Sequence, residues 1–117
     1  MIEEKKINLP QFGRDIISFK NIPPKLDSIN LTLAGWYANY SEKMIQLELL
    51  EASFWEKTKG LEKEKQLSDS MVRALWKITP DGNKMIEYER TLKTIEKLMS
   101  SLRTSLARAD REYRTQK

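Results

Sequence analysis

The chain has 117 residues, of which 32% are charged and 39% are hydrophobic, and its formal net charge is +4 at pH 7. This length accommodates one domain, expected to span residues 1–117, and the composition is too apolar for a disordered chain. The absence of cysteine and histidine excludes disulfides, cysteine-based zinc sites and catalysis by a thiolate or an imidazole.

Residues 1–27 are expected to form an irregular N-terminal segment. Three prolines and a glycine interrupt this stretch: Pro10, Gly13, Pro23 and Pro24. Between these breaks Phe12, Ile16 and Phe19 recur at helical spacing, which predicts one or two turns of amphipathic helix, with a strand as the second alternative. Their side chains either fold back onto the rest of the chain or dock onto a protein partner.

A long amphipathic helix is predicted over residues 28–66, beginning near Asp27 or Ser28, since either residue can cap a helix. Its apolar stripe repeats every seven residues: Leu33, Tyr40, Leu47, Phe54 and Leu61. Four further residues are expected on the same side: Trp36, Tyr37, Met44 and Leu50. A period of seven favours packing against a second helix in the manner of a coiled coil.

A short helix is predicted over residues 69–78, with Ser68 or Asp69 as its cap. Its apolar residues are Met71, Leu75 and Ile78 on one side, with Val72 and Trp76 next to them.

The last helix, predicted over residues 79–115, has the clearest start: Thr79 suits the N-cap, Pro80 the first position and Asp81 the positive end of the helix dipole. Apolar residues then follow at steps of three and four: Met85, Tyr88, Leu92, Ile95, Met99, Leu102, Leu106, Ala109 and Tyr113. Two long helices of similar length joined by a compact linker predict an all-α fold, an antiparallel, coiled-coil-like helical hairpin.

Neither catalysis nor a cofactor is expected. The carboxylates lie on helix faces that also carry lysine and arginine, and the four glycines are isolated, so no phosphate-binding loop is formed. No stretch of about 18 apolar residues and no apolar signal-peptide core is present, which predicts a cytoplasmic protein without membrane contact.

The final part of the chain is locally basic, with six basic and two acidic residues from position 97 onward. These six are the candidate nucleic-acid-binding residues: Lys97, Arg103, Arg108, Arg111, Arg114 and Lys117. They would contact phosphates; the alternative is that they complement the negative end of the helix dipole and keep the protein soluble. Arg111 and Arg114 are neighbours on a helix, but the set does not form one tight stripe.

The candidate partner-binding residues are Phe12, Ile16, Phe19 and Trp55. Trp36 and Trp76 are interpreted as anchors of the core or of an interface, and stacking on unpaired bases is the alternative. Trp55 is the tryptophan most suited to exposure, because Phe54 beside it occupies the heptad core position. A pair of helices buries only a thin core, so a protein partner or a homo-oligomer is expected.

Three segments carry a resemblance to a known group: Trp76-Lys-Ile-Thr-Pro-Asp-Gly82, Glu96-Lys-Leu-Met-Ser-Ser-Leu-Arg103 and Arg111-Glu-Tyr-Arg-Thr-Gln116. Over residues 30–116 the chain resembles small helical phage and prophage proteins encoded among recombination and replication genes. The resemblance implies a setting in phage DNA metabolism. Together with the local excess of basic residues it predicts a non-enzymatic accessory protein in phage DNA recombination or replication, with DNA as a possible partner. The alternatives are a module that inhibits or recruits a host or phage protein without touching nucleic acid, and a purely structural coiled-coil component.

Overall fold

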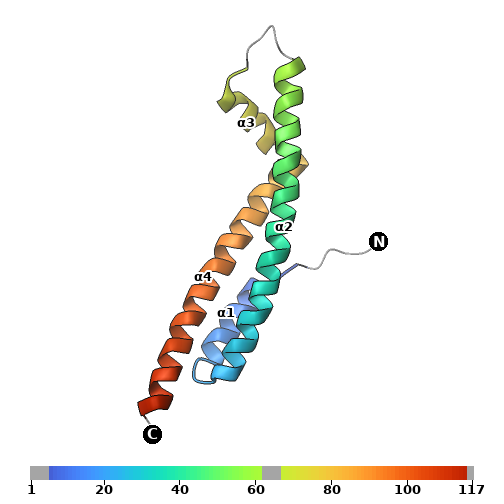
Figure 1. Ribbon diagram of the computed structural model, residues 1–117. Coiled ribbons are helices and arrows are strands. Elements are labelled where there is room, and N and C mark those ends of the chain that lie inside the picture. The colour runs from blue at the N-terminus through green and yellow to red at the C-terminus, as the bar shows by residue number, and fades with distance from the viewer. Residues whose placement is uncertain (1–5, 62–66, 116–117) are drawn as a thin grey trace, which may run out of the picture. The chain divides into compact units, whose positions relative to one another are not determined.

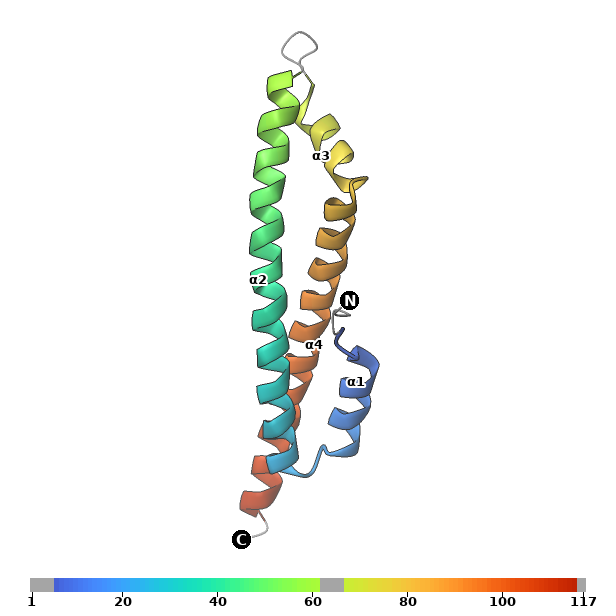
Figure 2. The ribbon, with the colours of Figure 1, turned by 90° about the vertical axis from the view of Figure 1, so that its right-hand side faces the viewer.

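A computed structural model describes residues 6–61 and 67–115 of the chain (Figure 1). Its helices are α1 (Leu9–Ser18), α2 (Pro23–Leu61), α3 (Asp69–Lys77) and α4 (Pro80–Thr115). The described residues group into two compact units: unit 1 comprises those up to Ala38 and from Lys93 onward, and unit 2 those from Asn39 to Leu92. The predicted all-α helical hairpin is confirmed, since in each unit a stretch of α2 packs against a stretch of α4, and α3 is the short connecting helix (Figures 1 and 2).

The N-terminal segment is more helical than its prolines suggest. α1 is capped by the side chain of Asn8, which accepts a hydrogen bond from the Gln11 N–H (3.2 Å). α2 begins at Pro23 rather than near Asp27 or Ser28, and the Ile22 carbonyl accepts its first bond, from the Leu26 N–H (3.1 Å). Prolines are compatible with these first positions because no helical partner exists there for their missing N–H.

The starts of α3 and α4 follow the predicted capping residues. The Ser68 hydroxyl caps α3 by accepting a hydrogen bond from the Met71 N–H (3.3 Å). The Thr79 hydroxyl accepts from the Gly82 N–H (3.0 Å) at the start of α4. The end of the predicted helix over 28–66, residues 62–66, lies outside the described residues.

Unit 1 has a core of aliphatic side chains from three helices. Its buried residues are Ile16 of α1, Leu26 and Leu33 of α2, and Ile95, Leu102 and Ala109 of α4. The residues of α2 and of α4 are seven apart within each helix, as the heptad pattern predicts. α1 approaches α4 at Gly13, where an added Cβ would lie 3.9 Å from Leu98 Cδ2, so the apolar side of α1 folds back onto the unit.

The core of unit 2 is mainly aromatic. Its buried apolar residues are Tyr40 and Leu47 of α2, Val72 and Trp76 of α3, and Tyr88 of α4. The Tyr40 and Tyr88 rings meet edge to face with centroids 5.4 Å apart, and the Lys43 ammonium lies over both at 5.2 and 5.6 Å. Phe54 of α2 contacts Trp76, again with centroids 5.4 Å apart. Residues later in α2 therefore contact residues earlier in the segment that follows it, as the Tyr40–Tyr88 and Phe54–Trp76 contacts show. This is the antiparallel arrangement.

One prediction about burial was wrong. Leu50 was expected on the apolar stripe of α2, but it is 50% exposed. On α3 the side that carries Val72 and Trp76 is buried, whereas the side that carries Met71, Leu75 and Ile78 is exposed.

Among the described residues, no helix is both long and apolar enough to cross a bilayer.

An ion pair joins the end of α2 to the start of α3 in unit 2. The Lys59 ammonium donates a hydrogen bond to the Asp69 carboxylate, and this bond, the Lys59 charge and the charge of Arg73 lower the pKa of Asp69 below its ordinary value of 3.8. Because the pKa is lower in the folded state, the pair stabilises the protein above pH 3.8, and this contribution is lost as the pH falls through the folded-state pKa.

Lys59→Met should therefore raise the pKa of Asp69 toward 3.8, because the substitution removes the largest cause of its lowering. The measurement is an NMR titration of the Asp69 carboxyl carbon. Lys57→Met, at an exposed neighbouring lysine, is the matched control and should leave the titration unchanged. An equal response to both substitutions would show that general charge, rather than this pair, sets the pKa.

Candidate functional site

The exposed face of α4 in unit 1 carries a continuous stripe of basic and hydroxyl side chains. Its members are exposed and follow one another at steps of three or four residues: Lys93, Lys97, Ser101, Thr104, Arg108 and Arg111. This spacing keeps side chains on one side of a helix. We call this surface the α4 basic stripe.

The residues that α4 buries in the core of unit 1 determine which side of the helix carries the α4 basic stripe. Lys97, Thr104 and Arg111 each follow a buried residue of α4 by two positions, which places them about 200° around the helix from the core. At a rise of 1.5 Å per residue the stripe is about 27 Å long. The packing of α4 against α1 and α2 thus leaves a straight row of donors pointing away from the core.

Acidic residues lie mostly on other sides of α4. Glu96 and Asp110 are displaced from the stripe, and Glu112 borders it four residues after Arg108. The Thr104 hydroxyl donates to the Ser100 carbonyl (3.2 Å) within the helix. A phosphate oxygen can replace that acceptor, because a hydroxyl rotates about its C–O bond. The stripe therefore offers charged and neutral donors of the kinds that contact phosphates.

The predicted nucleic-acid-binding residues are only partly brought together. Lys97, Arg108 and Arg111 share the α4 basic stripe, whereas Arg103 lies on another side of the helix. The Arg114 side chain and Lys117 lie outside the described residues. Lys93, Ser101 and Thr104 were not predicted. Lys93 precedes the basic segment that begins at residue 97, and Ser101 and Thr104 carry no charge. Reading α4 in steps of three and four would have identified them.

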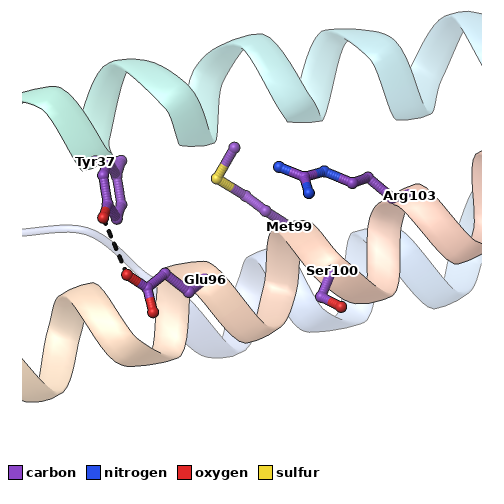
Figure 3. A pocket seen from close by; sticks show the side chains of 5 residues that line it. All are labelled: Tyr37, Glu96, Met99, Ser100 and Arg103. Atoms are coloured by element: carbon purple, nitrogen blue, oxygen red, sulfur yellow. Dashed lines mark hydrogen bonds between the residues drawn. The ribbon is translucent and has the colours of Figure 1, made fainter.

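Arg103 instead lines a shallow pocket of about 340 Å³ in unit 1 together with Tyr37, Glu96, Met99 and Ser100. Figure 3 shows Met99 and Arg103 projecting from α4 toward α2, and Arg103 extending toward Met99. The Tyr37 hydroxyl donates to Glu96 Oε1 at 3.0 Å. This hydrogen bond, with the negative charge of Glu96, raises the pKa of Tyr37 above its ordinary value of 10.0.

The pocket has the character of a packing contact between α2 and α4 in unit 1. A hydrogen bond in this pocket ties Tyr37 to Glu96. A tyrosine with a raised pKa stays protonated at neutral pH and is a poor base or nucleophile. Within the described parts of the chain, no cluster of three or more carboxylate, histidine or cysteine side chains could hold a metal ion.

The predicted partner-binding residues do not form one surface. Ile16 is buried in unit 1, and Phe12 and Phe19 are half-buried there. The exposed apolar residue of α1 is Ile17, at 72%. Trp55 belongs to unit 2, where it is half-buried beneath the Lys59 ammonium, 5.2 Å from the ring centroid. The structure thus favours the folded-back interpretation of Phe12, Ile16 and Phe19.

Comparison with protein-family models, with curated proteins and with solved structures finds no match to this chain.

Proposed function

We propose that unit 1 binds the phosphodiester backbone of nucleic acid through the α4 basic stripe and that the protein acts as a non-enzymatic accessory in DNA transactions. The observation that carries the proposal is the alignment of four basic and two hydroxyl side chains on one exposed helix face. Lysine and arginine bind phosphates by charge and release condensed counterions, and hydroxyl groups add neutral hydrogen bonds.

The position of the stripe argues against a role limited to helix-dipole complementation. A helix dipole acts on charges within about one turn of the helix end. Lys93 and Lys97 lie in the middle of α4, which ends at Thr115, so the dipole does not account for them. Basic side chains that continue along the middle turns of the helix are the arrangement expected of a surface that binds along a polyanion.

The proposed contacts of the stripe are to phosphates, and this predicts binding without sequence preference. Aromatic side chains for base stacking are absent from the six residues of the stripe, and so are the asparagine and glutamine side chains that pair with adenine. Contacts to phosphates alone carry no sequence information. The protein should therefore bind duplexes of different sequence with similar affinity.

The double variant Lys97→Ala/Arg108→Ala should weaken binding to a labelled DNA duplex by about tenfold or more at low salt. It should also reduce the slope of log K against log salt by about 2, because two phosphate contacts are lost. The measurement is fluorescence anisotropy at several salt concentrations, with single-stranded DNA titrated in parallel.

The matched control is Lys57→Ala/Lys84→Ala, which removes the same charge from two exposed lysines of unit 2. It should retain nearly the wild-type salt slope. Equal losses in the two double variants would mean that net charge, not the stripe, drives binding. No binding by the wild-type protein at low salt would overturn the proposed function.

A setting in phage DNA recombination or replication, and a cytoplasmic location, are part of the proposal and rest on the sequence alone. The second candidate function is a protein-binding module without nucleic-acid contact. It is favoured by the number of large apolar side chains that the helices leave exposed, among them Ile17, Leu31 and Leu49 at about 70%. Absence of DNA binding would make this the leading function.

A further inference from the structure

The cations of the α4 basic stripe form two pairs that are separated by a gap. Lys93 and Lys97 are about one turn apart at the start of the stripe, and Arg108 and Arg111 are about one turn apart at its end. Lys97 and Arg108 are eleven positions apart, which is about 16 Å along the helix axis. Arg103, the basic residue inside this interval, lies on another side of α4. The stripe is therefore basic at both ends and neutral in the middle.

The side chains that the stripe presents across the gap are small. Ser101 and Thr104 occupy the line of the stripe, and the exposed residues Ser100 and Ala107 border it. Small side chains let the backbone of a helix approach a broad surface, while long lysine and arginine side chains on either side reach beyond it. The middle of the stripe is thus shaped to lie against a surface whose negative charges are at its two edges.

This grouping of charges fits a groove of duplex DNA better than a single strand. A single strand carries phosphates at regular intervals, so evenly spaced cations would suit it. A groove of a duplex has a phosphate backbone at each edge and bases between. The major groove is about 12 Å wide and the minor groove about 6 Å. Lys97 and Arg108 would stand about 2 Å beyond each edge of the major groove, but about 5 Å beyond each edge of the minor groove.

We infer that α4 lies across the major groove of a DNA duplex, with Lys93 and Lys97 on the phosphates of one strand and Arg108 and Arg111 on those of the other. The inference rests on the proposed function and adds to it the form of the nucleic acid and the placement of the helix. The hydroxyl groups between the pairs then face the groove. A hydroxyl can bond to more than one kind of base there, so binding remains without sequence preference.

The packing of unit 1 leaves this side of α4 outward. α1 approaches α4 at Leu98, and α2 is hydrogen-bonded to α4 at Glu96. These residues come directly after and before Lys97, so each contact lies about 100° around the helix from that lysine, on opposite sides. The stripe is therefore midway between the two contacts. A helix that lies across the mouth of a groove, rather than within it, keeps α1 and α2 clear of the duplex.

A lysine added to the gap tests the placement. In Thr104→Lys the new cation lies over the groove, between the two backbones, so the slope of log K against log salt for a duplex should stay at the wild-type value. Ala107→Lys is the matched control, because it adds the same charge at an exposed position one turn before Arg111. It should steepen the slope by about 0.9, the value of one phosphate contact. Circular dichroism should show unchanged helix content in both variants, since lysine is a good helix former.

A second comparison tests the groove. In a duplex that contains glucosylated 5-hydroxymethylcytosine, neutral sugars fill the major groove and the phosphates are unchanged. The wild-type protein should bind this duplex about tenfold more weakly than the unmodified one at low salt, because α4 can then reach only one strand at a time and the contacts of one cation pair are lost. Fluorescence anisotropy with labelled DNA measures both comparisons.

The possible outcomes separate this inference from the proposed function. Equal binding of the two duplexes would overturn the major-groove placement, and so would equal steepening of the slope by Thr104→Lys and Ala107→Lys. A single strand of the same sequence that binds as tightly as the duplex would also overturn the inference. Each of these results would leave the proposed phosphate-binding function in place. An absence of binding to both duplex and single strand at low salt would overturn the proposed function itself, and the inference with it.

Discussion

Gly82→Ala should destabilise the protein by about 3 kcal/mol, the upper end of the usual cost of overpacking. A Cβ at this position would lie 1.9 Å from the Trp76 carbonyl oxygen and 2.7 Å from its carbon. That carbonyl cannot withdraw easily, because it accepts hydrogen bonds from the Thr79 N–H (3.0 Å) and the Thr79 hydroxyl (2.6 Å). The clash is with backbone in the turn between α3 and α4, so relief requires the turn to change.

The control for this substitution is Gly35→Ala. Gly35 is an exposed residue inside α2, and an added Cβ there meets nothing within 4 Å. Alanine should stabilise the protein at this site by roughly 0.5–1 kcal/mol, because glycine is the poorer helix former. Chemical denaturation followed by circular dichroism measures both free energies of unfolding. Two alanine variants with the same stability would contradict the close approach at Gly82.

Trp76→Ala should have a comparable effect, with a loss of about 3–5 kcal/mol. Trp76 is only 5% exposed, its ring centroid lies 5.4 Å from that of Phe54, and its indole N–H donates to the Met85 sulfur (3.4 Å). The side chain thus joins α2, α3 and α4 within unit 2. Its truncation leaves a cavity between the three helices, which cannot move together far enough to fill it.

Trp55→Ala provides the comparison, since Trp55 is half-buried and is covered on one face by the Lys59 side chain. Its truncation should cost about 1 kcal/mol, because much less apolar surface returns to water. Trp76→Phe should recover part of the stability lost in Trp76→Ala by restoring the contact with Phe54. Equal costs for the two alanine variants would indicate that Trp76 does not anchor the core of unit 2.

The elements that the sequence predicts well are those where two signals agree. At the start of α4, Thr79 and Pro80 supply capping chemistry just before a heptad pattern, and at α3 Ser68 supplies the predicted cap. The N-terminal segment was harder, because Pro23 reads equally as a helix breaker and as a first helical residue. Only the structure distinguishes them, through the Ile22 carbonyl that accepts the first bond of α2.

The candidate surfaces were predictable to a smaller extent. Lys97, Arg108 and Arg111 were identified by local charge, but the direction of Arg103 depends on which side of α4 faces α2. Exposed Ile45 and Leu49 were not predicted as a surface, because the heptad pattern describes one apolar stripe of α2 and these two residues lie on the opposite side of the helix. Hydrophobic periodicity shows that a helix has an apolar face, yet it does not say which apolar face a neighbouring helix covers.

The turn between α3 and α4 has a consequence for ancestry. The Thr79 hydroxyl donates a hydrogen bond to the Trp76 carbonyl and accepts one from the Gly82 N–H. Because Gly82 has no side chain, the Trp76 carbonyl can approach it closely. A descendant that lost the glycine would have to rebuild this corner, so the three positions should be inherited or replaced as a group. Tryptophan, threonine and glycine at this spacing in another helical protein therefore predict a turn of this kind between two helices. Such a match predicts the geometry of the turn, whereas a partner is recognised by the exposed faces of the helices.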